Sequence, residues 1–243
     1  YRREAAPAQW ATVQHSLGTL YLRRYERSGE EGHAATAAAH YQAALEEYRR
    51  EAAPAQWATV QHSLGTLYLR RYERSGEEGH AATAAAHYQA ALEEYRREAA
   101  PADWAMTQHS LGNLYARRYE RSGEEGHARR ARRRYRLSLA GADRYSLPAI
   151  YHFRAGAGLT RLFVRLKEWR HATDVYRRSV LALESLYAAA STRENKESWL
   201  REAQGLPASA AYAFARLDRL EEAIVALETG RARLLAEALE ANR

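Results

Sequence analysis

The sequence predicts an all-α protein, a solenoid of about five antiparallel helix hairpins. Residues 1–47 recur without a change as residues 48–94, and a third copy with substitutions runs to about residue 141. Prolines mark the same period at four positions that stand 47 residues apart: Pro7, Pro54, Pro101 and Pro148. A fixed period of this size is typical of arrays in which each unit completes the apolar core of its neighbours.

The composition also favours helices. Hydrophobic residues make up 46% of the 243 residues, but Ala, Leu and Tyr dominate them, and there are only three Phe. Charged residues add another 28%. Helix-forming residues are therefore abundant, and the β-branched residues that fill sheets are scarce.

Several classes of function are excluded by residues that the sequence lacks. There is no Cys, so disulfides, thiolate zinc sites and cysteine nucleophiles are excluded within these residues. No run approaches the ~18 apolar residues that cross a bilayer, and no basic-then-apolar leader pattern opens the sequence. We therefore expect a soluble, cytoplasmic protein without membrane contact.

Each repeat is expected to begin with a helix A. Pro7 suits its first turn, because the missing N–H would lack a partner there anyway. Gly18 lies on the side of Leu17 and Tyr21, where the absence of a side chain lets another helix approach closely. The predicted buried stripe has three- and four-residue spacing: Trp10, Val13, Leu17, Leu20, Tyr21 and Arg24.

A helix B is expected from about residue 33 to residue 51. Gly29 and Gly32 precede it and end helix A, and the two glutamates between them favour the positive N-terminus of the new helix. The predicted buried stripe of helix B consists of Ala34, Ala37, Tyr41, Ala44, Leu45 and Tyr48.

The two stripes carry a resemblance to a known family. Leu17-Gly18-x-x-Tyr21 followed by Ala37-x-x-x-Tyr41-x-x-Ala44 resembles the tetratricopeptide (TPR) signature. Two features depart from it: Gln14 occupies the slot of the family's tryptophan, and the period is 47 residues against the family's ~34. The additional residues are expected to lengthen both helices. The resemblance implies a right-handed superhelix whose A helices line a concave side, where partner peptides lie.

A shorter form of the pattern continues after the third repeat. One hairpin is predicted across Lys167-Glu168-Trp169 and another across Asp218-Arg219, with an intervening helical stretch that Gly205-Leu206-Pro207 breaks. Because the only methionine is Met106 and the sequence opens partway through a repeat, we expect a piece of a longer protein. We divide the chain into the tail of a preceding truncated repeat (1–6), three repeats (7–53, 54–100 and 101–147), a TPR-like fourth unit (148–190) and a fifth with an exit helix (191–243).

A narrower resemblance concerns nearly the whole chain. Stretches such as PAQWATVQHSLGTLYLRRY and ESWLREAQGLPASAAYAFARLDRLEEAIVALETGRARLLAEAL look like the TPR arms of bacterial CHAT-domain proteins, and residues 227–235 are the most specific part. In that family the repeats precede a caspase-like peptidase domain with a catalytic His and Cys. The resemblance implies that such a domain would follow Arg243. No catalytic residue is therefore assigned here, and we expect no enzyme activity in this chain.

The sequence predicts no metal, cofactor or phosphate site. Histidines recur, but His33 and His40 lie two turns apart and no HExxH or HxxxH pattern occurs, so surface or groove histidines are the simpler interpretation. Glycine-rich phosphate loops and nucleophile elbows are also missing. Gly29 and Gly32 flank two carboxylates, which would repel phosphate.

The face of the A helices outside the buried stripe is the first candidate surface for a partner. Its arginines, histidines and hydroxyls would suit an acidic or carboxylate-bearing peptide, because Arg clamps carboxylates with two parallel hydrogen bonds. A merely solvated face is the alternative. Leu22 and Leu69 are expected on the same face as the twelve candidate groove residues: Thr12, His15, Thr19, Arg23, Thr59, His62, Thr66, Arg70, Met106, His109, Asn113 and Arg117.

A basic patch on helix B of the third repeat is the second candidate. There HAATAAAHYQAAL becomes HARRARRRYRLSL, which introduces Arg129, Arg130, Arg132, Arg133, Arg134 and Arg136. Ala131, Tyr135 and Leu139 preserve the buried stripe. The cluster would suit an acidic protein, nucleic acid or an anionic membrane, although no aromatic residues are interleaved for base stacking. A solvated face, or pairing with the glutamate-rich turns, is the alternative.

Two functions follow. The leading one is a protein- or peptide-binding scaffold that acts as the regulatory or sensor TPR arm of a CHAT-type protein and holds the peptidase inactive until a partner docks. The alternative is a stand-alone TPR adaptor or regulator that engages an acidic partner or nucleic acid through its Arg-rich helix. The uncovered apolar face of the first repeat also predicts self-association through the ends of the array.

Overall fold

The computed structural model describes residues 3–229, apart from the side chain of Arg193, and throughout these residues the chain forms helices and turns without a strand. It forms two compact units, residues 1–127 and 128–243. The N-terminal unit holds α1 (Pro7–Ser28), α2 (Glu31–Glu47), α3 (Pro54–Ser75), α4 (Glu78–Glu94) and α5 (Pro101–Ser122), and α6 (Glu125–Arg144) begins in it and continues into the second unit. The C-terminal unit adds α7 (Ala149–Arg165), α8 (Trp169–Ala189), α9 (Arg193–Ala203), α10 (Leu206–Ala215) and helical residues 220–229.

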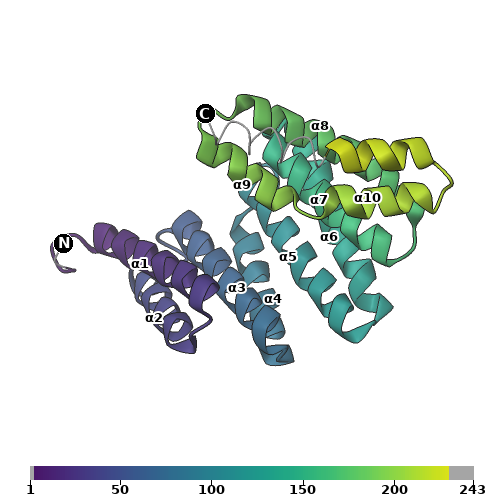
Figure 1. Ribbon diagram of the computed structural model, residues 1–243. Coiled ribbons are helices and arrows are strands. Elements are labelled where there is room, and N and C mark those ends of the chain that lie inside the picture. The colour runs from purple at the N-terminus through teal and green to yellow at the C-terminus, as the bar shows by residue number, and fades with distance from the viewer. Residues whose placement is uncertain (1–2, 230–243) are drawn as a thin grey trace. The chain divides into compact units, whose positions relative to one another are not determined.

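The helices pair as the sequence predicts. In the N-terminal unit, α1 packs against α2 and α3 against α4, and the hairpins then stack, α2 on α3 and α4 on α5 (Figure 1). In the C-terminal unit α7 and α8 form a third hairpin, and α10 packs against both of its helices. The predicted all-α solenoid of hairpins is confirmed.

Local sequence signals set the ends of the A helices. Pro7 is the first residue of α1, and its copies begin α3 and α5. Gly29 ends α1 with a φ of 77°, in the left-handed region, where its N–H donates to the carbonyl of Tyr25. A residue with a side chain would be strained there. The predicted start and stop of helix A are both confirmed.

Helix B is shorter than expected. It was predicted over residues 33–51, but α2 begins at Glu31 and ends at Glu47. Tyr48 leaves the helical conformation, and the carbonyl of Arg49 then accepts hydrogen bonds from the N–H groups of Ala52 and Ala53 in a turn. Ala53 directly precedes Pro54 and has φ −143° and ψ 60°, outside the helical region, as expected for a residue before a proline, and the next helix A begins at Pro54.

Each complete hairpin of the N-terminal unit is held by a glycine that faces a tyrosine ring. A Cβ added to Gly18 would lie 2.6 Å from the ring of Tyr41, and one added to Gly65 would lie 2.7 Å from the ring of Tyr88. The predicted stripe of helix B is buried at Ala34, Ala37, Tyr41 and Ala44, while Leu45 and Tyr48 are partly buried. The close approach expected at Gly18 is thus confirmed.

The predicted stripe of helix A is buried in the second copy but not in the first. Val60 and Leu67 are 1% and 0% exposed, whereas the identical Val13 and Leu20 are 40% and 43% exposed. The difference arises because α3 is covered by the preceding hairpin and α1 is not. Arg24, which was placed in the stripe, is exposed, and its guanidinium lies 5.2 Å from the ring centre of Tyr21.

The C-terminal unit has its own core, built around Phe153, Tyr176, Leu206 and Phe214. The predicted turns are confirmed: Lys167 and Asp218 adopt positive φ values of 59° and 60° between their flanking helices. The expected break between α9 and α10 falls at Gly205, with a φ of 75°.

The identical repeats offer a direct test of stacking. Leu67→Ala should lower the free energy of unfolding by about 2–5 kcal/mol, since the side chain is fully buried and its loss leaves a cavity. Leu20→Ala changes the same residue of the first copy and should cost clearly less, because no closed cavity forms at a half-exposed position. Urea denaturation measures both, and equal losses would contradict the uncovered face of α1.

The glycine contact gives a second prediction. Gly65→Ala should destabilise the protein by about 1–3 kcal/mol, because the ring of Tyr88 is fully buried and cannot swing away. Gly79→Ala is the control: this glycine lies in α4 with no atom within 4 Å of an added Cβ. It should stabilise the helix by up to about 1 kcal/mol. Thermal unfolding of the two variants in parallel would reveal the opposite signs, and a stabilised Gly65→Ala protein would refute the contact.

Candidate interaction surfaces on the A and B helices

The predicted groove residues lie along the A helices of the N-terminal unit, and each of them is at least partly exposed. α1 contacts α3, and α3 contacts α5, so the residues of neighbouring repeats form one row. Leu22 and Leu69, expected on this face, are instead buried at 7% and 3% exposure and belong to the core. The use of the row as a peptide groove stays a prediction.

Hydroxyl groups of the row bind tyrosines that lie in helix B, or directly after it, in the same repeat. The Thr12 hydroxyl lies 2.7 Å from that of Tyr48, and the Thr59 hydroxyl lies 2.8 Å from that of Tyr95. The Tyr88 hydroxyl donates to that of Thr66 over 3.2 Å. These threonines therefore fix the ends of the tyrosine side chains as well as facing the surface.

Histidines of the row connect neighbouring A helices. His15 Nε2 lies 2.9 Å from Ser63 Oγ, and His62 Nδ1 lies 3.0 Å from Thr107 Oγ1. The Thr107 hydroxyl already donates to the carbonyl of Asp103, so His62 Nδ1–H must be the donor. Burial lowers the pKa of His62 to about 4 and also lowers that of His15. In the third repeat, the Asn113 amide donates to Nε2 of His109 over 3.0 Å.

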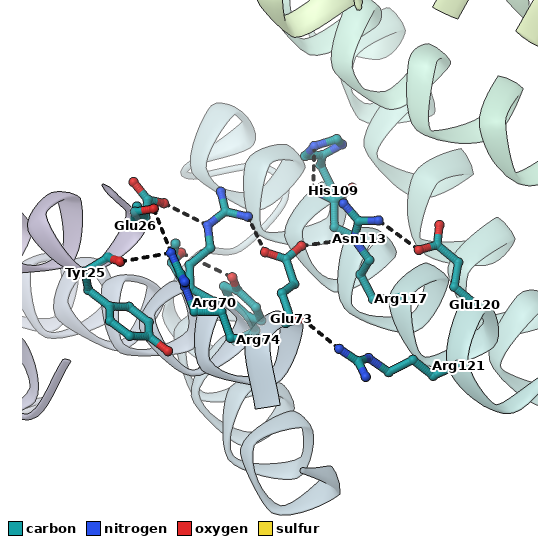
Figure 2. Close-up of polar contacts among 12 residues, drawn as sticks. Tyr25, Glu26, Arg70, Glu73, Arg74, His109, Asn113, Arg117, Glu120 and Arg121 are labelled. Atoms are coloured by element: carbon teal, nitrogen blue, oxygen red, sulfur yellow. Dashed lines mark hydrogen bonds and ion pairs between the residues drawn. The ribbon is translucent and has the colours of Figure 1, made fainter. Parts of the chain in front are cut away.

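A ladder of alternating charges crosses the three A helices, as Figure 2 shows. Arg70 donates from Nε to Glu26 over 2.8 Å and from Nη1 to Glu73 over 2.7 Å. Arg117 repeats the pattern, with 3.0 Å from Nε to Glu73 and 2.8 Å from Nη1 to Glu120. Glu73 therefore bridges two arginines from successive repeats, and each of those arginines binds two carboxylates.

Two further arginines bind the backbone of the preceding repeat. Arg74 Nη2 donates to the carbonyl of Glu26 over 2.9 Å, and its guanidinium lies 5.3 Å from the ring centre of Tyr25. Arg121 makes the same contacts one repeat later, with the carbonyl of Glu73 and the ring of Tyr72 (Figure 2). A hollow of about 390 Å³ between these groups is lined by Glu26, Arg70, Glu73 and Arg74.

The ladder changes the interpretation of the predicted acidic-peptide clamp. Arg70 and Arg117 already hold two carboxylates each, so an incoming carboxylate would have to displace one of them. Arg23 differs from its copies, since it makes no ion pair within residues 3–229. Repetition of the arginine in sequence thus reflects the joining of one repeat to the next.

A second set of ion pairs joins successive repeats near the start of each helix A. Arg50, before α3, donates to Glu93 over 2.7 Å and to Glu94 over 2.6 Å at the end of α4. Arg3 makes the same pairs with Glu46 and Glu47. The corresponding positions in the third repeat are Ala140 and Gly141, so α6 lacks both carboxylates.

The predicted basic patch lies on α6, where Arg129, Arg130, Arg133 and Arg136 are exposed and Arg132 and Arg134 are partly exposed. Of the predicted stripe, Ala131 and Tyr135 are buried and Leu139 is partly buried. Arg132 pairs with Glu168, and its guanidinium lies 5.3 Å from the ring centre of Phe163. A hollow of about 460 Å³ along this helix is lined by Arg129, Arg132, Arg133, Arg136, Leu137 and Ala140.

Sequence reasoning missed Tyr25 and its copy Tyr72, which are fully buried. The Tyr25 hydroxyl donates to Glu31 over 2.8 Å, and burial, together with this hydrogen bond, raises the pKa of Tyr25 to about 12. Tyr25 stands four residues after Tyr21, so extension of the stripe by one turn would have found it.

The described residues form neither a metal-binding cluster nor a membrane-spanning helix. Within residues 3–229, no group of three or more His, Asp or Glu side chains is placed to hold a metal ion. Over the same part of the chain, no helix is both long and apolar enough to cross a membrane.

Comparison with known proteins supports the fold. The chain is similar to the solved structure of BtubC (BKLC) from P. vanneervenii, with a TM-score of 0.54 and 10% sequence identity over 94% of this chain and 91% of that one. At this identity the similarity shows the fold alone, an all-helical repeat. No protein-family model and no curated protein sequence matches the chain.

The lowered pKa of His62 predicts that the stability of the protein depends on pH. Unfolded His62 would take up a proton near pH ~6.5, but the folded protein resists protonation until about pH 4. Stability should therefore be constant above the first value and fall as the pH drops toward the second. NMR titration of the His62 ring checks the pKa, and His62→Gln should weaken the pH dependence of unfolding. A ring that titrates near the unfolded value would contradict the burial.

Proposed function

We propose that the chain is a scaffold that binds a protein or peptide and serves as the regulatory or sensor arm of a larger CHAT-type, caspase-like protein. The observation that carries the binding role is the stack of hairpins, in which the A helices present one continuous row of polar side chains. Such stacks offer extended surfaces on which a partner lies across several repeats. The peptidase connection is supported by the sequence resemblance alone, at residues 227–235 above all, which lie mostly outside the described residues.

The TPR assignment has support in the contacts of its signature residues. Gly18 faces Tyr41, and Ala37 and Ala44 are fully buried, so these positions join helix A to helix B as a TPR hairpin requires. The longer period adds residues at the helix ends and leaves this contact unchanged. A TPR array usually acts through partners, which favours recognition over chemistry in these 243 residues.

Site-specific cross-linking tests the binding role. A photoreactive phenylalanine analogue at Thr12 or Thr59 lies on the proposed binding row, and one at Ala35 or Ala82 lies on the exposed outer side of a B helix in the same repeats. We expect a bound partner to be captured from the first pair of positions and not from the second. Capture from Ala35 and Ala82 alone would contradict the proposed row and would place the binding surface on the B helices.

The reading frame after the codon for Arg243 tests the connection to a peptidase. We expect it to encode a domain with a His and Cys pair, and replacement of that Cys by Ala should abolish peptidase activity of the longer protein. An immediate stop codon would reject this part of the proposal. It would favour the second candidate function, an adaptor without a peptidase, for which the exposed arginines of α6 are the supporting observation.

A further inference from the structure

One face of α6 carries an arginine stripe: Arg129, Arg132, Arg133 and Arg136, followed by Leu137 and Ala140. These residues are spaced three and four apart, so they lie on one side of the helix and together line its hollow of about 460 Å³. Arg129 and Arg136, at the two ends of the arginine set, are seven positions apart, or ~10 Å along the axis. The floor is aliphatic, because Leu137, Ala140 and the methylene stems of the arginines form it.

The arginines of the stripe are absent from the corresponding helices of the earlier repeats. The corresponding positions of α4 are Ala82, Ala85, Ala86, Gln89, Ala90 and Glu93. Corresponding positions of the two helices are equally exposed on this side. The exposed positions are 82, 86, 89 and 93 in α4 and 129, 133, 136 and 140 in α6. Packing therefore does not demand arginine here. The third repeat gains four positive charges on this face and loses the glutamate that would partly neutralise them.

The positive charge of the stripe is only partly compensated within the chain. Arg132 pairs with Glu168, and Arg136 lies 6.0 Å from the ring centre of Phe163. Arg129 also has an interaction partner within the chain, whereas Arg133 makes no ion pair among the described residues. Residues 128–243 carry a net charge of +9, whereas residues 1–127 carry −2. The field around the stripe thus favours an acidic partner.

We propose that the arginine stripe is the docking site of an acidic amphipathic helix of a partner protein. Arg133 and Arg136 bind carboxylates spaced three to four residues apart on that helix, and Leu137 and Ala140 contact aliphatic side chains beside them. The guanidinium fork binds a carboxylate through two parallel hydrogen bonds, and the stems cover apolar surface, which is why arginine is enriched at the energetic centres of interfaces. Nucleic acid fits less well, since the stripe has no aromatic side chain for a base and offers an aliphatic floor.

The inference deepens the second candidate function, because it rests on the same arginines of α6, but it needs neither a peptidase nor a partner bound to the A helices. The test measures fluorescence anisotropy of a labelled synthetic amphipathic helix with Glu beside a Leu seam, at ~150 mM salt. A matched peptide with Gln in place of each Glu is the probe control. The stripe variant carries three substitutions: Arg129→Ala, Arg133→Ala and Arg136→Gln. They introduce the residues that stand at the corresponding positions of α4, where they are part of a complete helix.

A second triple variant separates a specific site from bulk charge. Arg27→Ala, Arg49→Ala and Arg96→Ala remove the same charge from exposed arginines that make no ion pair within residues 3–229. We expect the stripe variant to bind the Glu peptide at least about tenfold more weakly, and the control variant to bind it as the unaltered protein does. Circular dichroism confirms that both variants are folded.

Several results would overturn the proposal. They are no binding of the Glu peptide by the unaltered protein, equal binding of the Gln peptide, or equal loss in the two triple variants. Displacement of the peptide by equimolar duplex DNA at the same salt concentration would instead identify the stripe as a nucleic-acid surface.

Discussion

The contact between a glycine of helix A and a tyrosine ring of helix B is the constraint on which the array depends. Gly18 and Gly65 lie so close to Tyr41 and Tyr88 that no side chain fits between them. This distance brings the far end of each ring to the surface of helix A, where a threonine meets its hydroxyl. The aromatic ring thus fills the core while its polar end is satisfied at the edge. The glycine–tyrosine contact consequently determines both the packing of the hairpin and the hydrogen bond at its surface.

Exact repetition imposes a second constraint, since the surface that ends one repeat must fit the surface that begins the next, identical repeat. The arginines satisfy this constraint because their side chains cross the junction between hairpins. Arg70 binds Glu26 of the previous copy and Glu73 of its own, and Arg117 does the same one repeat later. Partly exposed pairs of this kind contribute only ~0.2–1 kcal/mol each. Because these ion pairs recur at a regular spacing, they nevertheless favour the one register of stacked hairpins in which each of these arginines meets its glutamates.

Much of the fold could be predicted because its signals are local. Proline at the start of helix A, glycine in the left-handed region at its end, and the small residue at Gly18 each act within one turn or one hairpin. The end of helix B at Glu47 was missed because no glycine or proline directly follows it in the sequence, and the uneven burial of Val13 and Val60 was missed because it depends on neighbouring hairpins. For the same reason the sequence alone suggested that Arg70 was available to a ligand. Only the placement of Glu26 and Glu73 beside it reveals that its hydrogen bonds are already made.

Identity between repeats also separates structural from functional roles. A residue that recurs in every copy and contacts the next copy has a sufficient explanation in stacking, as Arg74 and Arg121 illustrate. A residue that changes on an exposed face without a change of burial has no such explanation. The arginines at positions 133 and 136 belong to this second group, because alanine and glutamine serve the same packing in α4. Like charges three and four residues apart on a helix repel one another, so helix stability alone does not account for this cluster, and this is the physical basis of the proposed docking site.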